Sequence, residues 1–137
     1  MHHGLSSEAV TAALKRVRAI CLGLPEVEER LSHGAPTWFV RGRRAFATFS
    51  DNHHEDGRLA VLCAALPEMQ QAHIEHEPDR FYRPPYVGHR GWVGVRLDRD
   101  LAWNVIEDVI HDAYHHVDVK TPRPRSHFTD ARWPGRR

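Results

Sequence analysis

Basic side chains gather in two short stretches that also contain glycine or proline, the residues of turns. They are Arg41, Arg43 and Arg44 in the first stretch, and Arg83, His89 and Arg90 in the second. Hairpins that project arginine can contact phosphates through guanidinium groups and can reach into a narrow minor groove. These six residues are therefore a candidate nucleic-acid-binding site; simple solvation at two turns is the alternative interpretation.

Aromatic residues offer a second candidate site, a stacking surface for a base or another planar ligand. Its residues are His33, Trp38, Tyr86 and Trp92. If Val93 and Val95 face the helices, strand alternation puts Trp92, Gly94 and Arg96 on the other face, where the missing side chain of glycine leaves room for something flat. The alternative is that these aromatic side chains fill the core between the sheet and the helices.

Other chemistries have weaker support in the sequence. His111 and His115 have the four-residue spacing that puts two imidazoles on one helix face, but no HExxH pattern occurs, so we predict no metal site. Cys21 and Cys63 have apolar neighbours and are expected to be small buried hydrophobic residues. No nucleophile elbow, phosphate loop or dinucleotide motif is present, so we expect no cofactor and no enzyme activity. An enzyme built from distant segments is the third interpretation.

The charge of the chain is unevenly distributed. Its 137 residues carry 19 Lys/Arg and 18 Asp/Glu, for a net charge of +1. The segment from Asp118 holds six Lys/Arg and two Asp/Glu, which makes it +4 and leaves −3 on residues 1–117. A basic tail on a mildly acidic body favours weak, salt-dependent contact with DNA over an entirely basic binding domain. No membrane-spanning run or signal peptide is evident, so we expect a cytoplasmic protein without a membrane partner.

Hydrophobic periodicity predicts three helices. The first begins at Ser6 or Ser7 and ends at Gly23, and the second runs from Glu68 to about Glu77 after Pro67. The third is capped by Asp98 or Asp100 and carries apolar residues at helical spacing up to Val117. A further helical turn is expected over 26–31.

Five strands are predicted between these helices. Three of them, 37–40, 45–49 and 58–63, follow one another as a meander, and a hairpin with a basic tip covers 81–97. The order is helix, three strands, helix, two strands, helix. It favours an α+β two-layer sandwich in which one antiparallel five-stranded sheet has its helices mainly on one face. Residues 1–117 are expected to form one domain, and residues 118–137 a basic tail that is partly ordered or packed on it.

The runs LPEVEERLSHGAPTWFVRGRRAFATF and PPYVGHRGWVGVRLD and the helix end AYHHV resemble the MmcQ/YjbR family of small bacterial proteins. The resemblance covers about Val10 to Val117. It implies a secretion-chaperone-like α+β fold, and it implies DNA binding through a pair of hairpin wings. Family members often have Ser-Tyr where this chain has Ala113-Tyr114.

Together these observations predict a small non-enzymatic module that binds DNA through basic hairpin tips and the tail. The alternative is a domain that binds a small molecule, a protein or a peptide on an aromatic-lined sheet face.

Overall fold

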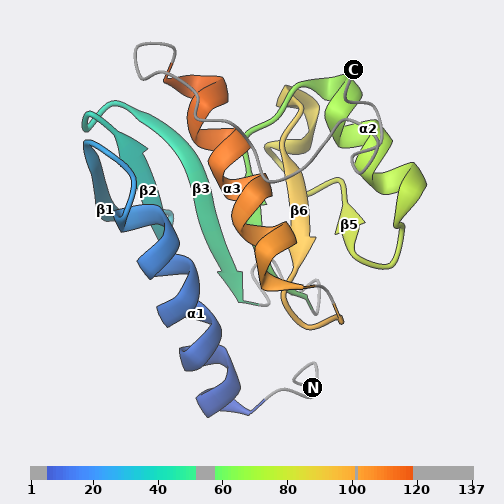
Figure 1. Cartoon of the computed structure of the whole chain (residues 1–137), viewed down its shortest axis with the longest axis horizontal. Helices are drawn as coiled ribbons and strands as arrows, with labels where there is room; N and C mark the ends of the chain where they lie inside the picture. Colours follow the sequence, from blue (N-terminus) through green and yellow to red (C-terminus); the bar gives the residue numbers. More distant parts are fainter. Residues whose placement is uncertain (1–5, 52–57, 101, 119–137) are drawn as a thin grey trace.

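A computed structural model of the chain describes residues 6–51, 58–100 and 102–118. Three helices and a six-stranded antiparallel sheet form two layers (Figure 1). The helices are α1 (Ser7–Leu22), α2 (Pro67–His76) and α3 (Trp103–Val117). The strands are β1 (Val27–Ser32), β2 (Ala35–Val40), β3 (Arg44–Asp51), β4 (Leu59–Cys63), β5 (Phe81–Tyr82) and β6 (Val93–Arg96), in the spatial order β1-β2-β3-β4-β6-β5. The predicted α+β class, with helices gathered on one face, is confirmed.

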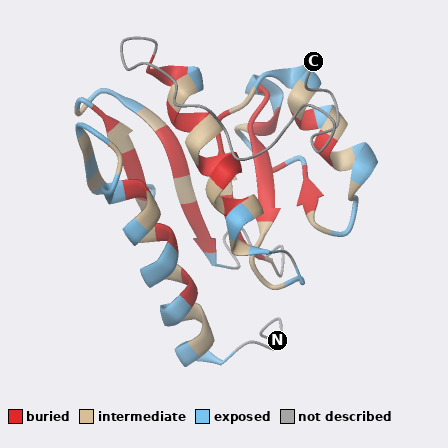
Figure 2. Ribbon diagram, viewed as in Figure 1, coloured by how far each residue is buried: buried red, intermediate tan, exposed pale blue. Residues whose placement is uncertain are grey.

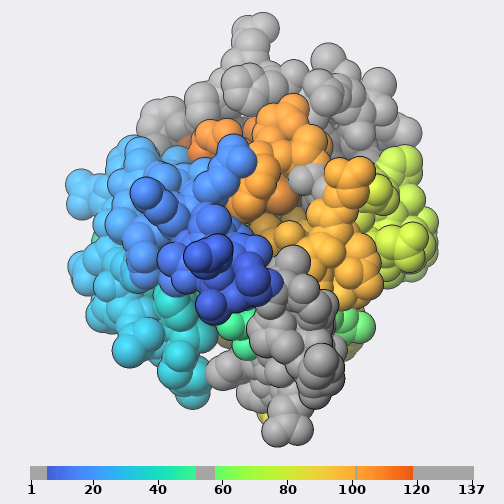
Figure 3. Space-filling view, turned by 90° about the horizontal axis from the view of Figure 1, so that it is seen from below, coloured from blue at the N-terminus to red at the C-terminus, as the bar shows by residue number. Residues whose placement is uncertain are grey.

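Two helices cover one face of the sheet. The hydroxyl of Ser6 accepts a hydrogen bond from the Ala9 N–H at 3.1 Å and so begins α1 at the predicted place. The face of α1 that carries Val17 and Cys21 is buried, and α3 buries its own apolar face beside it. Figure 3 shows these helices, α1 in blue and α3 in orange, on the same side of the molecule. No helix among the described residues is long and apolar enough to cross a membrane.

The expectation of a helical turn over 26–31 is wrong, because this segment is the edge strand β1. Val27 and Glu29 are half-buried, whereas Glu28 and Arg30 are exposed, which is the two-residue alternation of a strand. The strand reverses into β2 through His33 and Gly34, whose φ angles of 53° and 81° are those of a tight hairpin turn with both central residues left-handed. The sheet therefore has six strands, one more than predicted.

The predicted basic-tipped hairpin over 81–97 is also different in detail. Strand β5 ends at Tyr82, and residues 83–92 form a loop with one 3-10 turn at Gly88–Arg90 before β6 begins. Pro84 and Pro85 have no N–H to donate to a neighbouring strand, so the strand cannot continue through them. Within the loop, the Pro84 carbonyl accepts a hydrogen bond from the Gly88 N–H and the Pro85 carbonyl accepts one from the Val87 N–H. The segment is thus a compact loop and not a pair of long extended strands.

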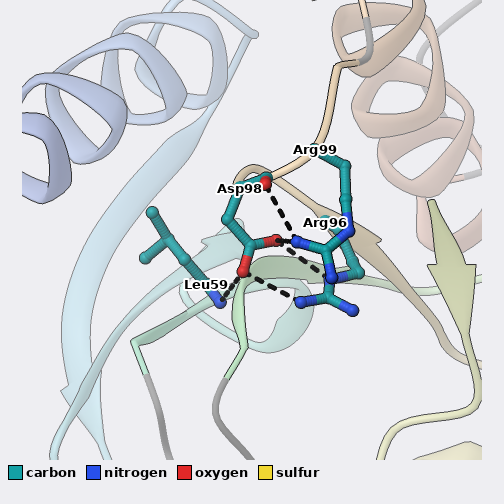
Figure 4. A network of polar contacts seen from close by, with 4 residues as sticks. All are labelled: Leu59, Arg96, Asp98 and Arg99. Atoms are coloured by element: carbon teal, nitrogen blue, oxygen red, sulfur yellow. Dashed lines mark hydrogen bonds and ion pairs between the residues drawn. The ribbon is translucent and has the colours of Figure 1, made fainter. Parts of the chain in front are cut away.

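The prediction that Asp98 or Asp100 caps the last helix is wrong, because α3 follows Ala102 and has no side-chain cap. The Asp98 carboxylate instead accepts two hydrogen bonds from Arg96, at 2.9 and 3.0 Å, and one from the Leu59 N–H at 3.4 Å (Figure 4). The Asp98 side chain is 3% exposed. Burial alone raises the pKa of this carboxyl, but the hydrogen bonds and charge of Arg96 and the Leu59 N–H outweigh burial and lower the pKa. The network fixes the end of β6 against the start of β4.

Candidate ligand-binding site

The face of the sheet that points away from α1 and α3 carries small side chains at its centre. Strand register puts Thr37 opposite Thr48, and Thr48 opposite Leu62. Ser50 shares this face with Thr48, because the intervening Phe49 is part of the helix-side core. Ala45 lies on it as well, because the register shifts at Phe46: Trp38 pairs with Ala47, whereas Phe39 pairs with Ala45. Figure 2 shows the buried residues concentrated in the central strands and on α3. Small residues leave space above this part of the sheet.

The 83–92 loop borders that space and makes an open cavity of about 510 Å³. The floor comes from β2, β3 and β4, and the walls come from β5, the loop and the β1–β2 turn. Its lining is Ser32, His33, Ala35, Thr37, Ala45, Thr48, Ser50, Leu62, Tyr82, Pro85, Tyr86, Val87, Arg90 and Trp92. This volume lies within the range of about 300–1,000 Å³ that is typical of small-molecule sites.

Tyr82 forms one wall and lies flat over Gly94 on β6. A Cβ atom added to Gly94 would overlap the Tyr82 ring, and the guanidinium of Arg58 stacks on that ring at 4.1 Å from its centroid. The space that glycine leaves at this position is therefore filled by the protein's own tyrosine and not by a ligand.

Replacing Gly94 by alanine is expected to destabilise the protein by about 1–3 kcal/mol, because the new methyl group displaces the Tyr82 ring. The measurement is urea denaturation of Gly94→Ala, Tyr82→Ala and the double variant. The double variant should lose less than the sum of the two single losses, since the overlap disappears with the ring. Strictly additive losses would contradict this packing.

Gln70 on α2 holds the loop in place, a role that no local pattern in the sequence predicts. Its side-chain amide is buried and donates to the carbonyls of Gly88 at 2.8 Å and Trp92 at 2.6 Å. Gly91 lies between these carbonyls with a φ of 98°, and a Cβ there would meet the Ala65 carbonyl oxygen at 2.5 Å. Only glycine therefore allows the loop to approach the end of β4 so closely.

Gln70→Leu is expected to cost about 1–3 kcal/mol of folding free energy, because the Trp92 carbonyl loses the donor from Gln70. Chemical denaturation measures the loss, and amide hydrogen exchange should show faster exchange in residues 86–92 than elsewhere. The neighbouring variant Gln71→Leu is the control, since Gln71 is exposed and its side chain hydrogen-bonds to Glu75 on its own helix. Equal losses of stability and equal exchange rates in the two variants would contradict the role of Gln70 in holding the loop.

Two threonine hydroxyls hydrogen-bond to each other on the floor. The Thr37 hydroxyl donates to the Ala35 carbonyl at 3.1 Å and lies 3.1 Å from the Thr48 hydroxyl. Thr37 is 2% exposed, whereas Thr48 is half-buried and lines the cavity. The floor thus contains a fixed polar group inside a largely apolar cavity.

Three of the four residues considered for ligand binding line this cavity, namely His33, Tyr86 and Trp92. Trp92 is only 6% exposed, so it forms a wall and not the open surface that was expected, whereas Tyr86 is 73% exposed at the rim. Trp38 is separated from them because it is fully buried in the helix-side core.

Trp38 instead belongs to a polar cluster at the edge of the core. Its indole N–H donates to Glu29 at 3.0 Å, and Arg18 of α1 binds the two oxygens of that carboxylate at 2.8 Å each. The hydrogen bond from Arg18 lowers the pKa of Glu29, burial opposes this, and the Trp38 N–H adds to the lowering. Trp38 is therefore left out of the candidate site.

The residues considered for nucleic-acid binding lie in two segments at one end of the sheet. The start of β3, the end of β4 and the start of β6 are adjacent, since Ala47 pairs with Cys63 and Cys63 pairs with Val93. The β2–β3 turn, with Arg41, Arg43 and Arg44, and the 83–92 loop, with Arg83, His89 and Arg90, are both at this end.

Arg41 and Arg44 make polar contacts within the domain. Arg41 lies 3.6 Å from a Glu26 carboxylate oxygen and 3.5 Å from one of Asp118. Arg44 donates to the Val117 carbonyl, at the C-terminal end of α3, at 3.2 Å. Both side chains thus hold the β2–β3 turn against the end of α3. Arg43, Arg83, His89 and Arg90 are exposed.

The two thiols and the His111/His115 pair of α3 are not assembled into a metal site. Cys21 and Cys63 are buried and free, and burial raises the pKa of both thiols. His111 lies 3.7 Å from Glu107, and His73 stacks on Phe81 with centroids 4.5 Å apart. In the part of the chain that the structure describes, no group of three or more His, Cys, Asp or Glu is arranged to hold a metal ion.

Comparison with known proteins identifies the family. The family model for YjbR matches residues 22–116, which is more than half of the chain. Among solved structures, Deinococcus radiodurans protein DR2400, which contains the DUF419 domain, superposes with a TM-score of 0.67 at 19% identity, covering 86% of this chain and 83% of that one. No curated protein matches the chain. The chain belongs to the YjbR family.

Proposed function

We propose that this protein is a small-molecule-binding module and that its ligand occupies the cavity between the sheet and the 83–92 loop. The observation that carries the proposal is the cavity itself, at about 510 Å³ with a lining that is mainly aromatic and aliphatic. Ligand sites in proteins combine such a lining with a few fixed polar groups. Here those groups are the threonine pair of the floor, together with His33 and Arg90 at the walls.

The hydrogen bonding of the Thr37 hydroxyl is consistent with ligand binding without catalysis. The Thr37 hydroxyl donates its proton to a backbone carbonyl and not to a side-chain base. A hydroxyl acting as a nucleophile instead needs a base that takes its proton. The anchored loop favours a preformed cavity, because Gln70 fixes the carbonyls of Gly88 and Trp92.

The test is a thermal-shift screen of planar metabolites and fragments at low and high salt. A ligand in the cavity should stabilise the protein by about 2.7 kcal/mol at roughly 100 times its Kd, with little dependence on salt for an uncharged compound. Tyr86→Ala, which removes part of the rim, should weaken the shift. Leu31→Ala is the matched control, because Leu31 is 75% exposed and does not line the cavity. The proposal would be contradicted if no compound in the screen stabilised the protein. It would also be contradicted if Tyr86→Ala and Leu31→Ala weakened the stabilisation equally.

Nucleic-acid binding is the second candidate, favoured by the position of both basic segments at one end of the sheet. Four to six phosphate contacts would give a log–log salt slope of roughly −4 to −5. Arg43→Glu with Arg83→Glu changes one exposed arginine in each segment and should abolish retention on duplex DNA at low salt. Lys15→Glu with Arg16→Glu, on the exposed face of α1, is the charge-matched control. Salt-independent retention, or equal retention of both double variants, would exclude these segments.

A further inference from the structure

We infer that the cavity selects a planar aromatic acid whose ring carries an N–H or O–H donor. This inference rests on the proposed function and adds the chemical class of the ligand. Three features of the lining point to it: the direction of the floor hydrogen bonds, the sign of the charge and the shape of the walls.

The floor presents an acceptor to the ligand. A threonine hydroxyl has one proton to donate. Thr37 gives its proton to the Ala35 carbonyl, so the 3.1 Å contact between the two hydroxyls requires Thr48 to donate to Thr37. With its proton directed to Thr37, the Thr48 hydroxyl keeps a lone pair that can accept a hydrogen bond, and Thr48 lines the cavity. A ligand group at this position must donate a hydrogen bond.

Arg90 gives the lining a positive charge. Among the described residues that line the cavity there is no Asp or Glu, and His33 adds a polar ring at the rim. A guanidinium is always charged and forms paired hydrogen bonds with a carboxylate. Arg90 lies with its guanidinium carbon 5.7 Å from the centroid of the Trp92 ring, which places this charge beside an aromatic wall. An acidic group on the ligand is favoured at this wall, and a cationic group is disfavoured.

The walls favour a flat ring. Tyr82 and Trp92 are buried walls and Tyr86 is an exposed rim residue, and all three line the cavity. The floor consists of alanine, serine and threonine side chains together with Leu62 of β4. Aromatic walls gain most from a planar ligand, which they contact by stacking or by edge-to-face packing. The donor is then directed to Thr48 and the acid to Arg90.

The experiment uses four probes that share one ring: indole-3-acetate, 1-methylindole-3-acetate, indole-3-acetamide and tryptamine. Titrations of the full chain are followed by 1H–15N NMR. Indole-3-acetate should bind most tightly, and removing its N–H by methylation should weaken binding about three- to tenfold, the size expected for one hydrogen bond. Neutralising its acid should weaken binding by about tenfold or more, as expected for a hydrogen bond to a charged group, and tryptamine should bind worst.

Variants assign each preference to its residue. Thr48→Val should remove the preference for the unmethylated ring and keep the preference for the acid. Arg90→Gln should do the reverse, whereas Lys15→Gln, with the same change of charge on the far face, should change neither. Equal affinity for the four probes overturns the inference. So does binding of neutral fragments in the cavity without binding of indole-3-acetate, and this result leaves the proposed function standing. If no fragment moves any cavity resonance, the proposed function fails as well.

Discussion

Asp98→Ala is expected to lower the free energy of unfolding by about 3 kcal/mol. The substitution leaves the Arg96 guanidinium, whose side chain is 16% exposed, without the carboxylate that binds it at 2.9 Å. Breaking a buried ion pair from one side is strongly destabilising because the remaining charge stays desolvated. The Leu59 N–H loses an acceptor in the same step. Urea denaturation with a far-UV signal measures the change.

Arg99→Ala is the control for this prediction. Arg99 also faces Asp98, but its guanidinium is 3.9 Å from the carboxylate and its side chain is 46% exposed. Its removal should change stability by less than about 0.5 kcal/mol. A loss below about 1 kcal/mol for Asp98→Ala would show that the Arg96 pair does not hold β6 to β4.

The same network predicts a dependence of stability on pH. The pKa of Asp98 is lowered by folding, so it lies below the unfolded value of about 3.9. Its contribution is therefore complete above about pH 5 and is lost as the pH falls through the folded pKa. Asp98→Asn should lose less stability than the wild type on acidification from about pH 5 to pH 2. Parallel pH profiles of the two proteins would contradict this assignment.

Ala45→Trp is expected to abolish ligand binding, with an affinity at least about 100-fold lower, equivalent to about 2.7 kcal/mol. Ala45 lines the cavity and is half-buried, so the largest side chain placed there occupies space that the ligand requires. The described residues leave room beside Ala45 for the larger side chain, and the variant should therefore stay folded, within about 1 kcal/mol of the wild type. Titration with the best compound of the screen measures the affinity.

A matched substitution separates steric filling from a general effect of tryptophan. Ala12→Trp adds the same side chain on the exposed surface of α1, which covers the other face of the sheet. It should leave ligand affinity unchanged. Full binding by Ala45→Trp would place the ligand outside the cavity.

Helices and the central hairpin were predictable because their signals are local. The apolar spacing of α1 and α3 and the turn between β2 and β3 lie within a few residues of one another. Strand β1 was predicted as a helical turn because the segment EVEERL is rich in charged residues, as the segments of exposed helices are. Its strand conformation depends on pairing with β2, from Val27 opposite Val40 to Ser32 opposite Ala35, and on a left-handed turn at His33.

The cavity was predictable only in part. Alternation along β6 correctly placed Trp92 and Gly94 on the face away from the helices, but it did not show that Tyr82 covers Gly94. Gln70 and Thr48 gave no local signal, because Gln70 acts on carbonyls 18 and 22 residues away and Thr48 pairs with a hydroxyl 11 residues away. Such contacts are set by tertiary packing and leave no periodicity in the sequence.

The indole N–H signals in a 1H–15N titration test the central claim most directly, since they report on both faces of the sheet at once. Trp92 lines the cavity, whereas Trp38 is buried in the helix-side core and Trp103 lies on α3 under the guanidinium of Arg16. With the signals assigned from Trp→Phe variants, a compound that stabilises the wild type should move the Trp92 signal in a saturable way and leave those of Trp38 and Trp103 in place. A stabilising compound that moves Trp38 or Trp103 but leaves Trp92 unchanged would contradict a ligand site in this cavity.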